Sequence, residues 1–185
     1  MEHFNEFIGV VKKYSEAYRD FEKLQKSEAP EFDFIPKVGD QKTGVVGEAF
    51  VFEYLKRKGH SPEFGGTVQE GWDIKYTPTS VAGDFAYVQV KAVSAFAKTK
   101  KINPIKLSPD NCEFCLISLD ENLLPDDIWR AKGYNDSKIK IQDGKKVLTG
   151  IKMPQSTEDD SSGFTQIENV FEDFKRHFPE LYPTG

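Results

Sequence analysis

The chain of 185 residues contains only two cysteines and two methionines, and its acidic residues outnumber its basic ones. Cys112 and Cys115 form a single C-x-x-C pair and lack the second pair that a structural zinc site usually needs. Strand alternation would send the two thiols to opposite faces, so we interpret them as small core or edge residues. The formal net charge of -5 excludes a generally basic nucleic-acid coat protein, and polyanion binding would need a local positive patch.

The sequence has no apolar run long enough to span a bilayer, so no membrane partner is expected. Its first twenty residues lack a basic segment followed by an apolar one, and no secretory signal is predicted. These absences and the reduced thiols together favour a cytoplasmic protein. His3, His60 and His177 are isolated in the sequence and form no pair at metal-ligand spacing.

Three parts are predicted along the chain. Residues 1–30 form an amphipathic helix, residues 40–120 form the core, and residues 121–185 form a C-terminal extension of the same domain. One apolar seam of the helix over 4–24 recurs at steps of three and four residues and consists of Phe4, Phe7, Val11, Tyr14, Tyr18 and Phe21. This seam either packs on the chain's own core or forms the contact of a homodimer.

The core pattern predicts an α/β fold around one mixed sheet flanked by helices. A helix with a broad apolar face begins near Asp40 and stops at Gly59. Four strand-like runs follow, at 61–68, 71–77, 84–93 and 112–120, and the second and third are expected to form a hairpin. The connector 94–111 is predicted as part helix or part extended chain.

Residues after Asp120 give weaker signals. Residues 123–134 are predicted as one or two helical turns. Residues 137–153 form a candidate hairpin with Asp143 and Gly144 at its turn, and residues 164–178 form a closing amphipathic helix.

Polar side chains interrupt the most hydrophobic strand of the core. Gln89 and Lys91 share one face of the run 84–93, because strand side chains alternate between faces. Asp73 lies beside that face if the preceding run forms a hairpin with it, and Glu48 lies on the helix that packs on the sheet. Two carboxylates and an amide oxygen suit Mg²⁺, and a lysine beside them can hold a water and offset charge on a phosphate. These four residues predict metal-assisted hydrolysis of a phosphodiester; the alternative is a solvated strand edge.

The stretches GEAFVFEYLKRKGHSPEF, GWDIKY and YVQVKA, in this order, resemble the PD-(D/E)XK nuclease superfamily. The closest similarity is to Mrr-type restriction enzymes and archaeal Holliday-junction resolvases. The resemblance covers residues 44–120. It implies a restriction-endonuclease-like core with the element order αβββαβ, preceded here by an N-terminal helix and followed by a C-terminal extension.

The same resemblance implies roles for individual residues. Glu48, Asp73, Gln89 and the carbonyl of Val90 would hold Mg²⁺ or Mn²⁺, and Lys91 would orient the attacking water. The chain has Gln89 where the family more often has a carboxylate, a replacement that Mrr-type enzymes also use. A neutral ligand weakens a cation site, so Glu48 would have to supply the missing charge.

A run of lysines follows the third strand-like run. The sequence from Phe85 to Pro109 has no Asp or Glu, and its lysines after Lys91 are Lys98, Lys100, Lys101 and Lys106. Lysines hold phosphates with little sequence readout, so we interpret these four as DNA-binding residues. The alternative is a solvated charge run without a ligand.

Two functions from different classes follow. One is a Mg²⁺-dependent DNA endonuclease of the restriction or repair type, with DNA as its partner. The other is a catalytically inactive module of the same fold that binds DNA or a protein, which the neutral Gln89 and the acidic net charge favour.

Overall fold

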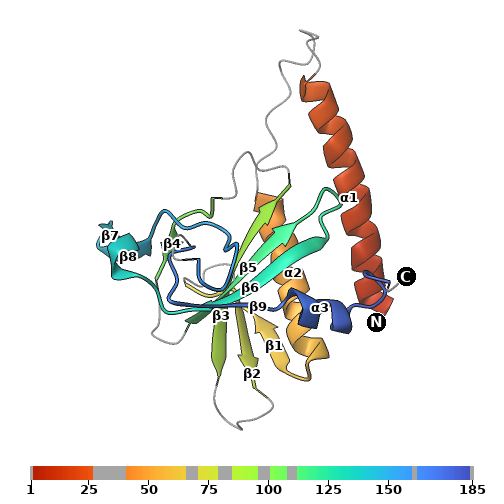
Figure 1. Ribbon diagram of the computed structural model, residues 1–185. Coiled ribbons are helices and arrows are strands. Elements are labelled where there is room, and N and C mark those ends of the chain that lie inside the picture. Colours follow the sequence, from red (N-terminus) through yellow and green to blue (C-terminus); the bar gives the residue numbers. More distant parts are fainter. Residues whose placement is uncertain are drawn as a thin grey trace.

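The computed structural model describes residues 2–26, 41–65, 71–78, 85–95, 101–107, 112–159 and 162–183. The helices are α1 (Glu2–Lys26), α2 (Gln41–Arg57) and α3 (Phe171–His177). The larger sheet contains β1 (Ser61–Phe64), β2 (Ile74–Thr77), β3 (Ala86–Ser94), β5 (Cys112–Leu119), β6 (Pro125–Lys132) and β9 (Gln166–Asn169). The small sheet contains β4 (Ile105–Lys106), β7 (Ile139–Gln142) and β8 (Lys145–Leu148), with the short 3-10 helix η2 (Asp136–Lys138) before β7. These elements form an α/β fold (Figure 1).

The larger sheet is mixed, as the sequence predicts. Its strand order is β1-β2-β3-β5-β6-β9, and β3 and β5 are parallel while every other neighbouring pair is antiparallel. The predicted pairing of the second and third strand-like runs is confirmed, with Ile74 opposite Val88. The general class is therefore shown, with strands from the C-terminal third completing the sheet.

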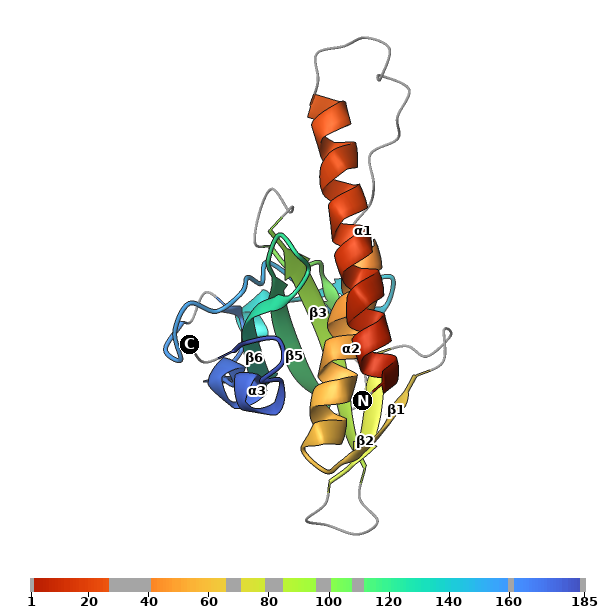
Figure 2. The same ribbon diagram turned by 90° about the vertical axis from the view of Figure 1, so that its right-hand side faces the viewer.

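One face of the larger sheet carries the three helices. α1 and α2 lie side by side on this face, and α1 extends beyond the sheet (Figure 2). Phe4, Ile8 and Val11 of α1 are buried in the same cluster as Phe50 of α2, and the rings of Phe4 and Phe50 are 6.1 Å apart. The N-terminal part of the predicted seam therefore packs on the chain's own core, as one of the two alternatives expects.

α2 approaches the sheet closely because residue 47 is glycine. A Cβ atom at Gly47 would lie 2.8 Å from Cβ of Ala92 and 2.9 Å from Cγ2 of Ile117, which is closer than real Cβ contacts allow. The helix ends as predicted, and Gly59 has a φ of 85°, which suits glycine. This close packing holds the helical turn that carries Glu48, the next residue, against β3.

The opposite face of the larger sheet packs against the small sheet. A second buried cluster joins strand residues of the larger sheet with the small sheet and the chain after it, and includes Val93, Phe114, Leu116, Trp129, Ile105, Leu148 and Ile151. The predicted hairpin is confirmed as β7 and β8, whose turn residues Asp143 and Gly144 have φ values of 50° and 72°. Both values lie in the left-handed region that such tight turns require.

Two sequence predictions are wrong. Residues 123–134 contain strand β6 and no helical turn, and the first part of the predicted closing helix, 166–169, is strand β9. The connector is described over residues 101–107, which are extended and contain β4, in line with the extended part of its prediction; the helix that αβββαβ places before the fourth strand is not among these described residues. None of the helices in the described ranges combines the length and apolar character needed to cross a bilayer.

Candidate functional site

Asp73 lies just before the first residue of β2. Beyond this point, β2 no longer pairs with the edge of β3. Its backbone N–H donates to the carbonyl of Val88 at 2.9 Å, and its Oδ2 accepts from the N–H of Val90 at 2.7 Å. The Asp73 carboxylate therefore accepts the β3 hydrogen bond that a backbone carbonyl would accept if β2 continued along β3. Because the N–H and C=O of a strand residue point to the same side, the Val90 carbonyl leaves β3 on the side of Asp73.

Gln89 is buried in the middle of β3 and is only 7 % exposed. Its Oε1 has no hydrogen-bond partner among the residues that the structure describes. The pairing register sets Gln89 opposite Phe114 and Lys91 opposite Leu116, which belong to the second buried cluster. Gln89 and Lys91 thus share the face that the sequence predicts, beside apolar neighbours.

Glu48 approaches from the other face of the sheet. Val90 and Ala92 contact the α2 face, as the close approach of Gly47 shows. Burial raises the pKa of the Glu48 carboxyl, the negative charge of Asp73 raises it further, and the positive charge of Lys91 lowers it. These influences require the three charges to lie near one another.

The structure therefore brings Glu48, Asp73 and Lys91 together at one edge of β3. Groups from both faces of the sheet meet there because β2 begins only at Ile74, and Asp73, the residue before it, binds the edge of β3 that β2 leaves uncovered. Gln89 shares the face of Lys91 on the same strand. Lys91 is half-buried and forms no ion pair within the described ranges.

The donor set can be tested against a divalent cation. The described residues contain no group of three or more His, Cys, Asp and Glu side chains suited to a metal ion. Glu48 and Asp73 supply two carboxylates, and Mg²⁺ usually takes only one or two together with waters. The buried Oε1 of Gln89, which lacks a partner among the described residues, is a hard oxygen of the kind that completes such a set. By the type of their donor atoms, the residues present therefore fit Mg²⁺ or Mn²⁺.

The predicted DNA-binding lysines are placed only in part. Lys101 and Lys106 are exposed, whereas Lys98 and Lys100 lie outside the described residues.

A cavity of about 600 Å³ opens on the face of the larger sheet that packs against the small sheet. It is lined by Ser118, Asp127, Lys152, Met153, Pro154, Gln155, Ser156 and Asp159. None of the four candidate site residues lines it.

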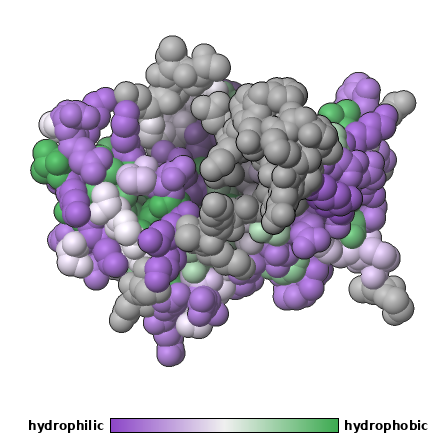
Figure 3. All heavy atoms as spheres, turned by 90° about the horizontal axis from the view of Figure 1, so that it is seen from above, coloured by the Kyte–Doolittle hydropathy of each residue, from purple (hydrophilic) through white to green (hydrophobic). Residues whose placement is uncertain are grey.

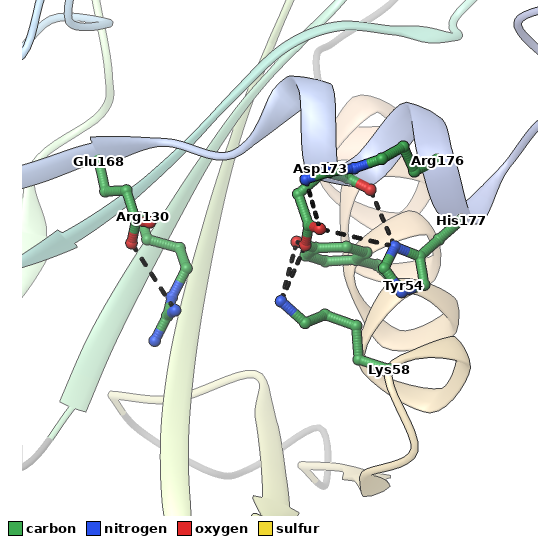
Figure 4. A network of polar contacts seen from close by, with 7 residues as sticks. All are labelled: Tyr54, Lys58, Arg130, Glu168, Asp173, Arg176 and His177. Atoms are coloured by element: carbon green, nitrogen blue, oxygen red, sulfur yellow. Dashed lines mark hydrogen bonds and ion pairs between the residues drawn. The ribbon is translucent and has the colours of Figure 1, made fainter.

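A polar network that no sequence pattern indicates joins α2 to α3 (Figure 4). Asp173 accepts hydrogen bonds from the Tyr54 hydroxyl and from Lys58 Nζ, the latter at 2.8 Å, and Arg176 lies 3.1 Å away. Burial raises the pKa of Asp173, but the bonds from Lys58 and Tyr54 outweigh burial and hold it at about 2. These contacts fix the C-terminal helix to the helix that carries Glu48.

No protein-family model matches the chain, and a search of curated proteins found no match.

Proposed function

We propose that this protein is a Mg²⁺- or Mn²⁺-dependent DNA endonuclease with a restriction-endonuclease-like core. One observation carries the proposal: a buried amide oxygen of Gln89 lacks a partner within the described ranges, on the strand that also carries Lys91 and binds Asp73. Leaving a buried acceptor unsatisfied costs about 1–3 kcal/mol. Such a cost is expected where a ligand satisfies the group, and the carboxylates of Asp73, bound to the same strand, and of Glu48 make a cation the best candidate.

The chain's own residues have separate tasks in this proposal. Glu48, Asp73, Gln89 and the Val90 carbonyl would hold the cation, which when bound polarises a phosphate oxygen and makes a bound water more acidic. The bond from the Val90 N–H keeps Asp73 oriented. Lys91, which has no carboxylate partner among the described residues, orients the attacking water and offsets charge that develops on the phosphate.

A catalytically inactive module that binds DNA or a protein is the second candidate. It is favoured by the small charge of the site, since among the described residues two carboxylates converge there and the third oxygen is neutral. Cation binding separates the two candidates. A working site makes the protein more stable against heat when Mn²⁺ is added, because a ligand that binds only the folded state stabilises it.

A cleavage screen tests the proposal. The purified protein is incubated with supercoiled plasmid, linear duplex, single-stranded DNA and a four-way junction, each with Mg²⁺, Mn²⁺ or EDTA. We expect cleavage of at least one substrate with either cation and none with EDTA. Intact DNA in every metal-containing reaction would contradict the endonuclease and favour the inactive module.

A further inference from the structure

The small sheet and the chain beside it concentrate positive charge in an acidic protein. The described stretches 101–107 and 136–153 contain two aspartates, Asp136 and Asp143, and seven lysines: Lys101, Lys106, Lys138, Lys140, Lys145, Lys146 and Lys152. Six of these lysines are exposed and Lys138 is half-buried. We call the six exposed side chains the lysine surface. The whole chain has a net charge of -5, so this local excess is opposite in sign to the rest.

The pairing register shows why several of these lysines point away from the core. Ile105, Leu148 and Ile139 lie opposite one another across the three strands and pack into the second buried cluster. Lys106 and Lys140 flank Val147 in the next row, so they lie on the outer face. Viewed from above, the side of the molecule where Figure 1 places the small sheet is largely hydrophilic (Figure 3).

Two further lysines are held directly opposite each other. Lys101 and Lys152 form an isolated antiparallel bridge, and both are exposed. Directly opposed side chains of a β-bridge lie on the same face, with Cβ atoms about 4.5–5.5 Å apart, and like charges at such positions are destabilising. An anion that binds between the two ammonium groups would remove this cost.

Cations elsewhere in the described chain usually have carboxylate partners. Arg57 pairs with Glu180 at 2.7 Å, and Arg130 pairs with Glu113 at 2.8 Å. By contrast, Lys101, Lys140 and Lys152 form no ion pair with any described residue, and the same holds for Lys138 and Lys146. The fold therefore neutralises most described cations around the larger sheet, whereas these five lysines form no ion pair within the described ranges.

We propose that the lysine surface binds the phosphates of duplex DNA and is a DNA-contacting surface separate from the catalytic residues. This inference rests on the proposed function for its choice of partner. The small sheet packs on the same face of the larger sheet that carries Gln89 and Lys91. A duplex held by these lysines therefore lies on the side of the sheet from which Lys91 reaches a phosphate.

Paired double variants test the surface. Lys140→Gln with Lys152→Gln removes two charges from the lysine surface. Lys12→Gln with Lys13→Gln removes the same charge from two exposed positions of α1, far from the small sheet in Figure 1, and serves as the control. Binding of a short fluorescein-labelled duplex is followed by anisotropy in EDTA over a series of KCl concentrations, so that no cleavage interferes.

We call the double variant Lys140→Gln with Lys152→Gln the small-sheet variant. Its slope of log affinity against log salt is expected to be smaller in magnitude than the parent's by about 2, since each phosphate contact contributes about 0.9. Its affinity at low salt should fall roughly tenfold or more, while the control stays close to the parent protein. A small-sheet variant with the parent's slope, or a control that weakens as much, would overturn the inference. Binding of the parent to anionic vesicles but not to duplex would also overturn it.

Failure of the proposed function gives a different pattern. If the parent protein binds duplex through these lysines but cleaves no DNA with Mg²⁺ or Mn²⁺, the lysine surface stands and the inactive module is the function. If the protein cleaves DNA and the small-sheet variant binds and cleaves like the parent, the lysine surface is wrong and the endonuclease stands.

Discussion

Glu48 is held in an environment that disfavours its charge. Burial and the neighbouring Asp73 raise its pKa, so the folded state binds this proton more tightly than the unfolded state does. Both states are protonated well below the ordinary pKa, and both are ionised well above the raised one. The ionised carboxylate therefore lowers the stability of the folded protein at neutral pH and not under acidic conditions.

Replacing Glu48 with Gln is expected to raise the melting temperature at neutral pH by roughly 1–4 °C without added metal. The gain should shrink as the pH falls below the ordinary pKa of a glutamate, because the parent side chain is then neutral too. Differential scanning calorimetry at several pH values measures both effects. Stabilisation by Mn²⁺ should be smaller in the variant than in the parent protein, because one ligand charge is gone.

A lower melting temperature for Glu48→Gln at neutral pH would show that the carboxylate is a structural partner rather than a ligand held under strain. Glu48 would then have to be removed from the candidate site.

At the scale of elements, Gly47 controls how closely α2 lies on β3. Gly47→Ala would push a methyl group against the rigid Ala92 and Ile117 side chains, and we expect a loss of about 1–3 kcal/mol in the free energy of unfolding. Gly44→Ala on the same helix is the matched control. Its nearest atom would lie 3.9 Å away, so the better helix propensity of alanine should stabilise the protein by up to about 1 kcal/mol.

Urea unfolding of the two variants compares these outcomes directly. If Gly47→Ala is as stable as Gly44→Ala, the helix does not pack on the strand as described. The placement of Glu48 beside Asp73 would then lose its support.

The contact between α2 and α3 predicts a pH-dependent stability. Asp173 has a pKa of about 2 in the folded protein against an ordinary 3.8, so its stabilising contribution is present above pH 3.8 and is lost as the pH falls towards 2. Asp173→Asn should cost about 2 kcal/mol at neutral pH, since it weakens charged hydrogen bonds from Tyr54 and Lys58.

Glu172→Gln on the same helix provides the control, because its ion pair with Lys175 is largely exposed and contributes about 0–1 kcal/mol. Chemical unfolding at neutral pH and near pH 2 measures the difference. An Asp173→Asn cost that stays the same at both pH values would contradict the assigned pKa.

The sequence predicts those elements whose apolar residues follow a single helical or strand period throughout. α1 and α2 have long apolar faces at helical spacing, and β3 and β5 are rich in strand-forming residues, so tertiary packing and local pattern agree. The pattern over β6 wrongly predicts helical turns because Ile128 faces the helices while Trp129 and Ala131 face the small sheet. A short strand buried on both sides loses its alternation and cannot be told from a helical turn by period alone.

The candidate site shows the same division. Alternation placed Gln89 and Lys91 on one face, because that rule depends only on the strand. The position of Asp73 depends on where β2 begins, and the side from which Glu48 approaches depends on Gly47. The link between Tyr54 and Asp173 joins residues more than a hundred positions apart, which no local pattern encodes.

At the scale of the whole molecule, α1 is also predicted to form the contact of a homodimer, which the structure of a single chain does not test. Phe4, Ile8 and Val11 are buried in the chain's own core, and the homodimer through the helix 4–24 stays a prediction. Sedimentation velocity at tens of micromolar tests it, and a dimer would support a second contact along the helix. A clean monomer at that concentration would contradict the homodimer and leave α1 as a cover for the core.

Charge is distributed unevenly over the molecule, and lysines without an ion pair in the described ranges occur at two sites. Most described cations around the larger sheet have carboxylate partners, whereas Lys91 and five lysines in and beside the small sheet have none among the described residues. One site would act on a phosphate and the other would hold the duplex. An acidic net charge is therefore compatible with DNA as the partner.

Cleavage of supercoiled plasmid in Mn²⁺ is measured side by side for the parent protein, Asp73→Asn and Lys91→Ala, and tests whether these residues form a nuclease site. The parent is expected to nick or linearise the plasmid, and each variant is expected to be at least about 100-fold slower. Mn²⁺ should still raise the melting temperature of Lys91→Ala but not of Asp73→Asn, because the lysine acts on water and phosphate rather than on the cation. Parent-like cleavage by both variants would contradict the claim that these residues form a nuclease site.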